Sequence, residues 1–130
     1  MSMEVVVSYA RGCDLKATAG YVLQALVRLD KGDTVLCRAN RNSDTDFMVP
    51  LLAEGLGIPC TMYQTMLHEK AFDRDIRMVM KADKVVAFFP EEAPMHGGTG
   101  HVVEVAIRME KPVEAYAISE TGELRSVGET

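Results

Sequence analysis

The chain has 130 residues, 48% of them hydrophobic, which suffices for one domain whose apolar core needs neither disulfides nor a structural metal. Its formal net charge of −5 disfavours a general nucleic-acid binder, because such proteins rely on Lys and Arg to neutralise phosphates. No charged leader precedes an apolar stretch at the start of the sequence, and no apolar run approaches the roughly 20 residues that span a bilayer. The scattered Cys13, Cys37 and Cys60 form no zinc or disulfide pattern. We therefore expect a cytoplasmic protein without a membrane span or metal site.

The first half of the chain predicts strands and helices in alternation. The β-branched run at residues 4–9 is typical of a central strand that is buried on both faces. Asp14 can cap the helix that follows, in which apolar residues recur at helical spacing up to about residue 31. A strand follows at residues 33–39, then a helix opened by Ser43 or Asp44 that runs to residue 56, and then another strand at residues 58–63.

The second half repeats this alternation after a longer loop. A helix at residues 72–82 leads to an apolar strand at 84–89, and a glycine-rich turn then opens an amphipathic helix. A strand at 112–118 follows, and the tail from Ser119 fits either a hairpin or a frayed end. Strands that alternate with helices are typical of parallel βαβ units. The sequence therefore predicts a single α/β domain over residues 1–130, with a three-layer, doubly wound parallel sheet of about five strands.

In such a sheet, ligands bind outside the carboxyl ends of the strands, where the strand order reverses. Three loops at these ends are rich in Gly, Asn, Arg, Asp or His, at residues 10–13, 40–46 and 90–101. Tyr9 and Arg11 are placed to stack on a base or clamp it, whereas Asn40 and Arg41 are either ligand contacts or ordinary loop residues. The first strand is not followed by G-x-G-x-x-G, and no Gly-Lys-Ser/Thr occurs, which argues against dinucleotide and P-loop folds.

The glycine-rich stretch predicts an anion site. Gly97, Gly98, Thr99 and Gly100 open a helix, where bare backbone N–H groups and the positive end of the helix dipole suit a phosphate. The alternative is a tight turn that needs glycine for its conformation alone. His101 can donate to a phosphate or shuttle a proton, or can be a solvated histidine.

Glu104 lies one turn inside that helix. An acid there repels the phosphate that the helix start attracts, so it suggests chemistry or recognition of a hydroxyl beside the phosphate. Arg108 follows four residues later, and the alternative is therefore a surface ion pair along the helix.

The stretch from His96 to Glu104, HGGTGHVVE, resembles the Pro-Gly-Gly-x-Gly-Thr-x-x-Glu motif of the SLOG superfamily of Rossmann-like nucleotide-ligand domains. His96 replaces the proline of that motif and His101 replaces the threonine. Arg74 matches an arginine that the family carries on the preceding helix. The superfamily includes the "lonely guy" phosphoribohydrolases, the core of DNA-processing protein A and small stand-alone bacterial and phage proteins. More distantly, Asp75 and Gly100 to Glu104 resemble the nucleoside 2-deoxyribosyltransferases.

The resemblance implies a domain that binds a nucleotide or nucleotide-derived ligand without a further cofactor, with phosphate on residues 97–101 and the sugar near Glu104. It leaves open an enzyme that cleaves or transfers an N-glycosidic bond, with Glu104 as nucleophile or oxocarbenium stabiliser and with Arg74 or His101 holding the phosphate. A third possibility is a DNA-processing accessory or a protein-interaction module. Direct binding of nucleic acid is disfavoured by the acidic charge.

Two helices carry apolar residues on more than one face. These residues fall in the runs at 78–80 and 102–107. A helix that is apolar on more than one face is generally buried on more than one face. We therefore expect a homodimer that packs through the helices flanking the strand at 84–89.

Overall fold

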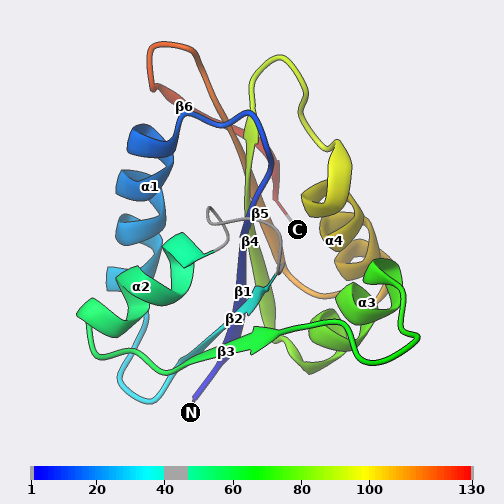
Figure 1. The fold of residues 1–130 in the computed structure, drawn as a ribbon. Helices are drawn as coiled ribbons and strands as arrows, with labels where there is room; N and C mark the ends of the chain where they lie inside the picture. The colour runs from blue at the N-terminus through cyan, green and yellow to red at the C-terminus, as the bar shows by residue number, and fades with distance from the viewer. Residues whose placement is uncertain (1, 40–46, 130) are drawn as a thin grey trace.

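The computed structural model describes residues 2–39 and 47–129, which form four α-helices and one six-stranded sheet (Figure 1). The strands are β1 (Glu4–Tyr9), β2 (Thr34–Arg38), β3 (Cys60–Tyr63), β4 (Lys84–Pro90), β5 (Val113–Ile118) and β6 (Leu124–Glu129). The helices are α1 (Leu15–Val27), α2 (Met48–Gly55), α3 (Ala71–Lys81) and α4 (Gly97–Arg108). None of the helices in these two ranges has the length and apolar character needed to traverse a bilayer.

The strands lie in the order β3-β2-β1-β4-β5-β6, so the direction in which the sheet grows reverses between β1 and β4. Strands β1 to β5 pair with one another in parallel, and β6 pairs with β5 in the antiparallel direction. The predicted α/β architecture is confirmed, but the sheet is mixed and has one strand more than the five expected. Residues 119–123 are too few for a crossover, so the chain can only turn back as a hairpin.

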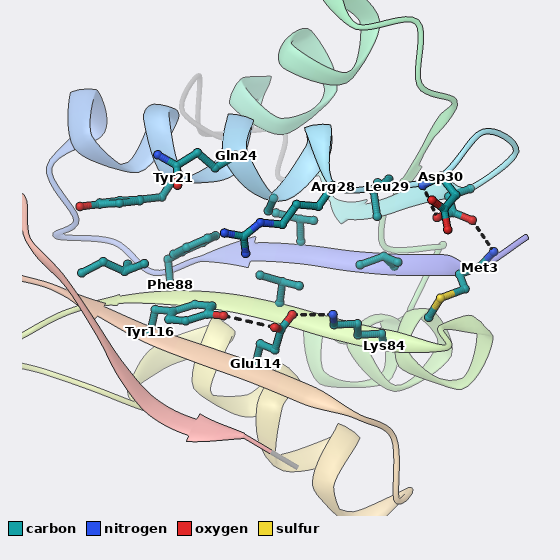
Figure 2. A pocket seen from close by; sticks show the side chains of 16 residues that line it. Met3, Tyr21, Gln24, Arg28, Leu29, Asp30, Lys84, Phe88, Glu114 and Tyr116 are labelled. Carbon is teal, nitrogen blue, oxygen red and sulfur yellow. Dashed lines mark hydrogen bonds and ion pairs between the residues drawn. The ribbon is translucent and has the colours of Figure 1, made fainter.

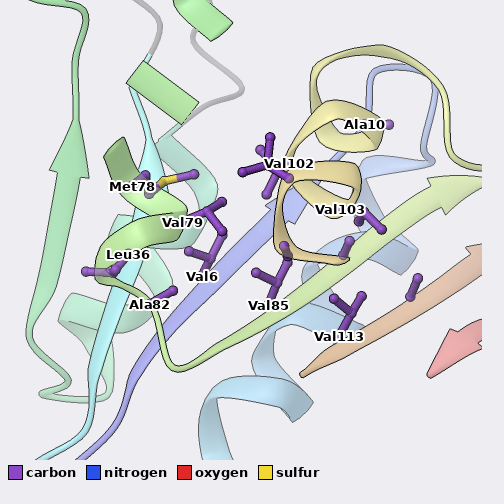
Figure 3. Close-up of a cluster of buried hydrophobic side chains, with 14 of the residues drawn as sticks. Val6, Ala10, Leu36, Met78, Val79, Ala82, Val85, Val102, Val103 and Val113 are labelled. Atoms are coloured by element: carbon purple, nitrogen blue, oxygen red, sulfur yellow. The ribbon is translucent and has the colours of Figure 1, made fainter. Parts of the chain in front are cut away.

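Helices cover both faces of the sheet, with α1 and α2 on one face and α3 and α4 on the other (Figure 1). Successive strand residues point to opposite faces. In β1 this places Val6 in the core under α3 and α4 (Figure 3), while Val5 enters the core under α1 and α2. Both side chains are buried, which explains why β1 is a continuous apolar run.

The helix starts differ in how they are capped. The Asp14 carboxylate accepts the backbone N–H of Ala17 at 2.9 Å and caps α1, as the sequence predicts. No side chain caps α3 or α4, whose N-cap residues are Lys70 and His96. The cap expected for α2 at residues 43–44 lies outside the described residues.

The apolar surplus of α3 and α4 is mostly covered within the chain. Residues 78, 79, 102, 103, 105 and 106 are buried in the core beneath these helices. Met80 and Ile107, 63% and 51% exposed, are the two apolar residues of these runs that face outwards. Burial within one chain therefore accounts for most of this apolar surface, and the homodimer stays a prediction.

Candidate functional site

A cavity of about 630 Å³ lies at the carboxyl ends of the strands, where the strand order reverses between β1 and β4. Its walls come from the loop after β1, the end of β2, the segment after β4, and the first residues of three helices, which are Leu15, Ala71 and Gly97. This is the position that the sequence predicts for a ligand.

The cavity is lined by three arginines, Arg11, Arg38 and Arg74. No Asp or Glu is among the described residues that line it, although acids outnumber bases in the chain, 19 to 14. Low-dielectric walls that carry one sign of charge concentrate the field inside a cleft. The cavity therefore suits an anion.

Two helix starts strengthen this field. Ala71 and Gly97 begin α3 and α4 at the cavity wall, and neither helix is capped by a side chain. The first N–H groups of a helix have no partner within the helix, and they carry the positive end of its dipole. Both helix starts thus add positive potential and backbone donors to the arginine-lined cavity.

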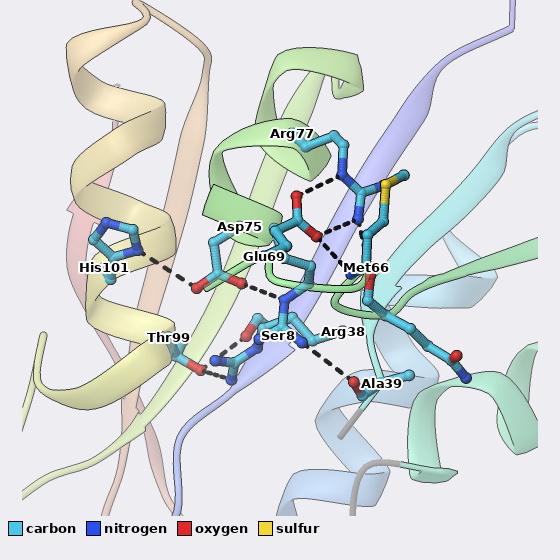
Figure 4. Close-up of polar contacts among 11 residues, drawn as sticks. Ser8, Arg38, Ala39, Met66, Glu69, Asp75, Arg77, Thr99 and His101 are labelled. Atoms are coloured by element: carbon cyan, nitrogen blue, oxygen red, sulfur yellow. Dashed lines mark hydrogen bonds and ion pairs between the residues drawn. The ribbon is translucent and has the colours of Figure 1, made fainter. Parts of the chain in front are cut away.

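Asp75 of α3 and His101 of α4 face one another (Figure 4), and Arg74 extends this chain of polar contacts. Its Nε donates to Asp75 Oδ1 at 2.9 Å and its Nη1 donates to the Ala39 carbonyl at 3.2 Å. Asp75 Oδ2 lies 3.4 Å from Nδ1 of His101. Asp75 does not line the cavity, and its carboxylate pairs with Arg74, so a contact of Asp75 with a ligand stays a prediction.

A second polar chain joins β1, β2 and α4 (Figure 4). Thr99 is fully buried, and its Oγ1 accepts from Nη2 of Arg38 at 2.9 Å and lies 2.8 Å from Oγ of Ser8. Thr99 lines the cavity and its hydroxyl holds Arg38, while its contact with a ligand stays a prediction. Sequence reasoning missed Arg38 and Ser8, although Arg38 carried a usable signal as the charged last residue of a strand at the predicted edge.

The glycines have different structural roles, and all three lie within α4 rather than in a turn before it. Gly97 has φ +74°, a conformation that favours glycine, and a Cβ there would meet no atom within 4 Å. A Cβ on Gly98 would overlap Nη1 of Arg38, and a Cβ on Gly100 would lie 2.6 Å from the backbone carbon of Met95. Gly100 does not line the cavity, and the close approach of Met95 explains its lack of a side chain.

Glu104 lies on the outer surface of α4. Its side chain is 57% exposed and its Oε1 pairs with Nη2 of Arg108 at 2.8 Å, the surface ion pair that the spacing allowed. Glu104 does not line the cavity, and neither does His101, whose ring packs 4.2 Å from that of Phe72. The predicted catalytic pair is thus divided, with Arg74 in the cavity wall and Glu104 outside it.

The remaining predicted ligand contacts come from the first two loops. Tyr9 and Arg11 both line the cavity. Asn40 and Arg41 lie outside the described residues. Cys13 also lines the cavity, and burial raises the pKa of its thiol.

A smaller cavity of about 270 Å³ lies between α1 and the adjacent face of β1, β4 and β5 (Figure 2). Several of the side chains that line it are hydrogen-bonded or ion-paired. Glu114 binds Lys84 and accepts from the Tyr116 hydroxyl at 3.2 Å, and the Lys84 partner lowers the pKa of Glu114. Asp33 accepts the N–H groups of Met3 and Asp30, which lower its pKa. Both acidic and basic side chains line this cavity, so it lacks the single sign of charge that distinguishes the arginine-lined one.

The Cys37 and Cys60 sulfurs lie 3.6 Å apart, and the hydrogen bond between them lowers the pKa of Cys60. Across residues 2–39 and 47–129, no group of three or more His, Cys, Asp or Glu residues has an arrangement that could hold a metal ion. The chain matches no known family model, and no curated protein is significantly similar to it.

Proposed function

We propose that the protein binds a nucleotide or nucleotide-derived small ligand in the arginine-lined cavity. The observation that carries the proposal is a cavity of about 630 Å³ at the strand reversal, lined by three arginines and by no described carboxylate. Cavities of this size hold small molecules, and guanidinium groups favour phosphate because their planar N–H groups match its oxygens.

The lining of the cavity offers surfaces for both parts of such a ligand. Arg38, Gly97 and Gly98 meet at the start of α4, where an anionic group would accept backbone and guanidinium N–H groups. Tyr9, Leu15 and Pro90 supply aromatic and apolar surface for a base or another flat group.

The fold that we propose for this site is the three-layer, doubly wound Rossmann-like arrangement of the SLOG superfamily. The strand order, the helices on both faces and the glycine–acid spacing from Gly97 to Glu104 support it. The antiparallel β6 departs from a strictly parallel sheet.

Cleavage or transfer of an N-glycosidic bond is not proposed. Such a reaction needs a carboxylate beside the sugar. Glu104 pairs with Arg108 on the protein surface, and the buried Asp75 is bonded to Arg74 and His101. No observation favours a DNA-processing or protein-interaction role over ligand binding.

Titration calorimetry tests the proposal with nucleoside monophosphates and diphosphates, ADP-ribose and cyclic nucleotides, with uncharged nucleosides for comparison. We expect at least one phosphorylated compound to bind, and to bind better than its nucleoside. Arg11→Gln should weaken binding about tenfold or more, since a hydrogen bond to a charged group contributes ~1.5–3 kcal/mol. Arg125→Gln, at a side chain of β6 that is 58% exposed and does not line the cavity, is the matched control and should bind as wild type does. Uniform absence of binding would refute the proposal.

A further inference from the structure

The sheet brings together two cysteines that lie 23 positions apart in the sequence. Cys37 is on β2 and Cys60 begins β3, and these two strands pair in parallel. The register sets Val35 opposite Cys60, so Cys37, two residues further along β2, points to the same face of the sheet. Both cysteines contact the apolar cluster under α1 and α2, and their sulfurs are 3.6 Å apart.

The two thiols differ in exposure and in acidity. Cys37 is 2% exposed, whereas Cys60 is half-buried and lies on β3, the strand at the edge of the sheet. The hydrogen bond with Cys37 lowers the pKa of Cys60, and the thiolate rather than the thiol is the nucleophile. A small reagent from solvent therefore reaches Cys60 first, with the sulfur of Cys37 already beside it.

The distance between the sulfurs is short enough for a covalent bond to form between them. A disulfide joins two sulfurs at about 2 Å, so this pair has to approach by about 1.5 Å. Rotation about the Cα–Cβ bonds moves a cysteine sulfur over distances of this size. Redox-sensing cysteines share this arrangement, in which an accessible thiol of lowered pKa lies next to a second cysteine that resolves the oxidised form.

We propose that Cys37 and Cys60 form a reversible dithiol–disulfide site that is oxidised by a hydroperoxide, with Cys60 as the attacking sulfur and Cys37 as the resolving one. Neither cysteine lines the arginine-lined cavity, so this site goes beyond the proposed function and does not depend on it.

With hydrogen peroxide the reaction has two steps. The Cys60 thiolate first attacks one peroxide oxygen, the O–O bond breaks, and the sulfur is oxidised to a sulfenic acid. The hydroxide that leaves takes up the proton released by the Cys60 thiol and becomes water. The Cys37 sulfur then attacks the Cys60 sulfur, the S–O bond breaks, and the departing hydroxide takes the Cys37 proton as a second water. One peroxide is thus reduced by the two electrons that the thiols lose, and a dithiol reductant restores them.

Peptide mass spectrometry of the full chain after treatment with hydrogen peroxide tests the proposal. We expect wild type to lose two thiols, to yield one cross-linked pair of peptides that carries Cys37 and Cys60, and to regain both thiols with dithiothreitol. Cys13 is the internal control, because it is buried and its pKa is raised, and it should remain a thiol at the same peroxide dose. Non-reducing electrophoresis should show that the cross-link lies within one chain.

Two serine variants separate the roles of the two sulfurs. Cys37→Ser keeps a hydroxyl that can donate to Cys60 but cannot resolve it, so Cys60 should accumulate as a sulfenic acid, which dimedone labels. Cys60→Ser removes the attacking sulfur, and the buried Cys37 should then react with peroxide about tenfold more slowly or less than Cys60 does in wild type. If Cys37→Ser does not fold, the wild-type cross-link and Cys60→Ser still decide the proposal.

Several results would overturn the proposal. Wild-type Cys60 that is oxidised to a sulfenic or sulfinic acid while Cys37 stays a thiol would show that the two sulfurs do not join. A disulfide between two chains would give the resolving role to another sulfur. Equal oxidation rates for Cys13 and Cys60, or no loss of thiols at all, would show that Cys60 is not a preferred site of attack.

Discussion

Asp75→Asn should strongly destabilise the protein. The Asp75 side chain is 2% exposed and supplies the carboxylate that pairs with Arg74, which is 8% exposed. The asparagine keeps the shape of the side chain and can still accept from Nε of Arg74, so the main loss is the negative charge. Breaking a buried ion pair by neutralising one partner costs ~3–5 kcal/mol, because the other charge stays buried without compensation. For a domain of this size, ~2.1 cal/mol/K of unfolding entropy per residue converts that loss into a fall in melting temperature of about 10–20 °C.

Thermal and urea unfolding measure the effect, and the same helix offers a matched control. Asp73→Asn makes the same chemical change at an exposed position in the first turn of α3. It should cost no more than ~1 kcal/mol, the size of a charge interaction with a helix end. The double variant Arg74→Met with Asp75→Asn removes both buried charges and should recover most of the loss. An Asp75→Asn protein as stable as Asp73→Asn would refute the reasoning.

Three further changes have expected outcomes of their own. Gly20→Ala, in open space on α1, should raise the free energy of unfolding by ~0.4–1 kcal/mol, which urea unfolding measures as a higher midpoint. A lower midpoint would contradict the helical geometry at this position. The pKa of Asp33 is lowered by its backbone donors, so its stabilisation is present above the ordinary carboxyl pKa and is lost as the pH falls through the lowered one. Asp33→Asn should therefore flatten the acid decline in urea midpoint, and an unchanged decline would exclude this cause. Cys60, whose pKa is lowered, should be alkylated by iodoacetamide before the buried Cys13 near neutral pH, and peptide mass spectrometry checks the order.

The sequence predicts the strands well because buried parallel strands are locally apolar. The run Glu4–Tyr9 is identical to β1, since both faces of this strand are buried and every residue contributes to the pattern. The hairpin strand β6 was one of two alternatives left open at Ser119. It alternates in character and carries exposed residues such as Leu124 and Arg125, so composition alone does not distinguish it from a frayed end.

The position of the candidate site could be predicted from the sequence, but the side chains that line it and the contacts between them could not. Its location follows from a rule about parallel sheets that needs only the element order. Which side chain faces the cavity depends on contacts between distant segments. The hydrogen bond from Arg38 to Thr99 joins residues that are 61 positions apart in the sequence, and no local sequence pattern predicts it. Glu104 was misleading for the opposite reason, since its family-like spacing is local while its orientation is set by how α4 packs against the sheet.

The central place of β1 in the sheet has a consequence for how the chain folds. The hairpin of β5 and β6 joins segments that are close in sequence, so it can form early. The hydrogen bond from the backbone N–H of Glu4 to the Asp83 carboxylate joins residues that are 79 positions apart, and closing so long a loop costs more entropy. We therefore expect the first strand to enter between β2 and β4 late in folding. The arginine-lined cavity lies beside that junction, so it would be completed only in the last stage. A molecule that occupies it would then slow unfolding and leave the folding rate nearly unchanged.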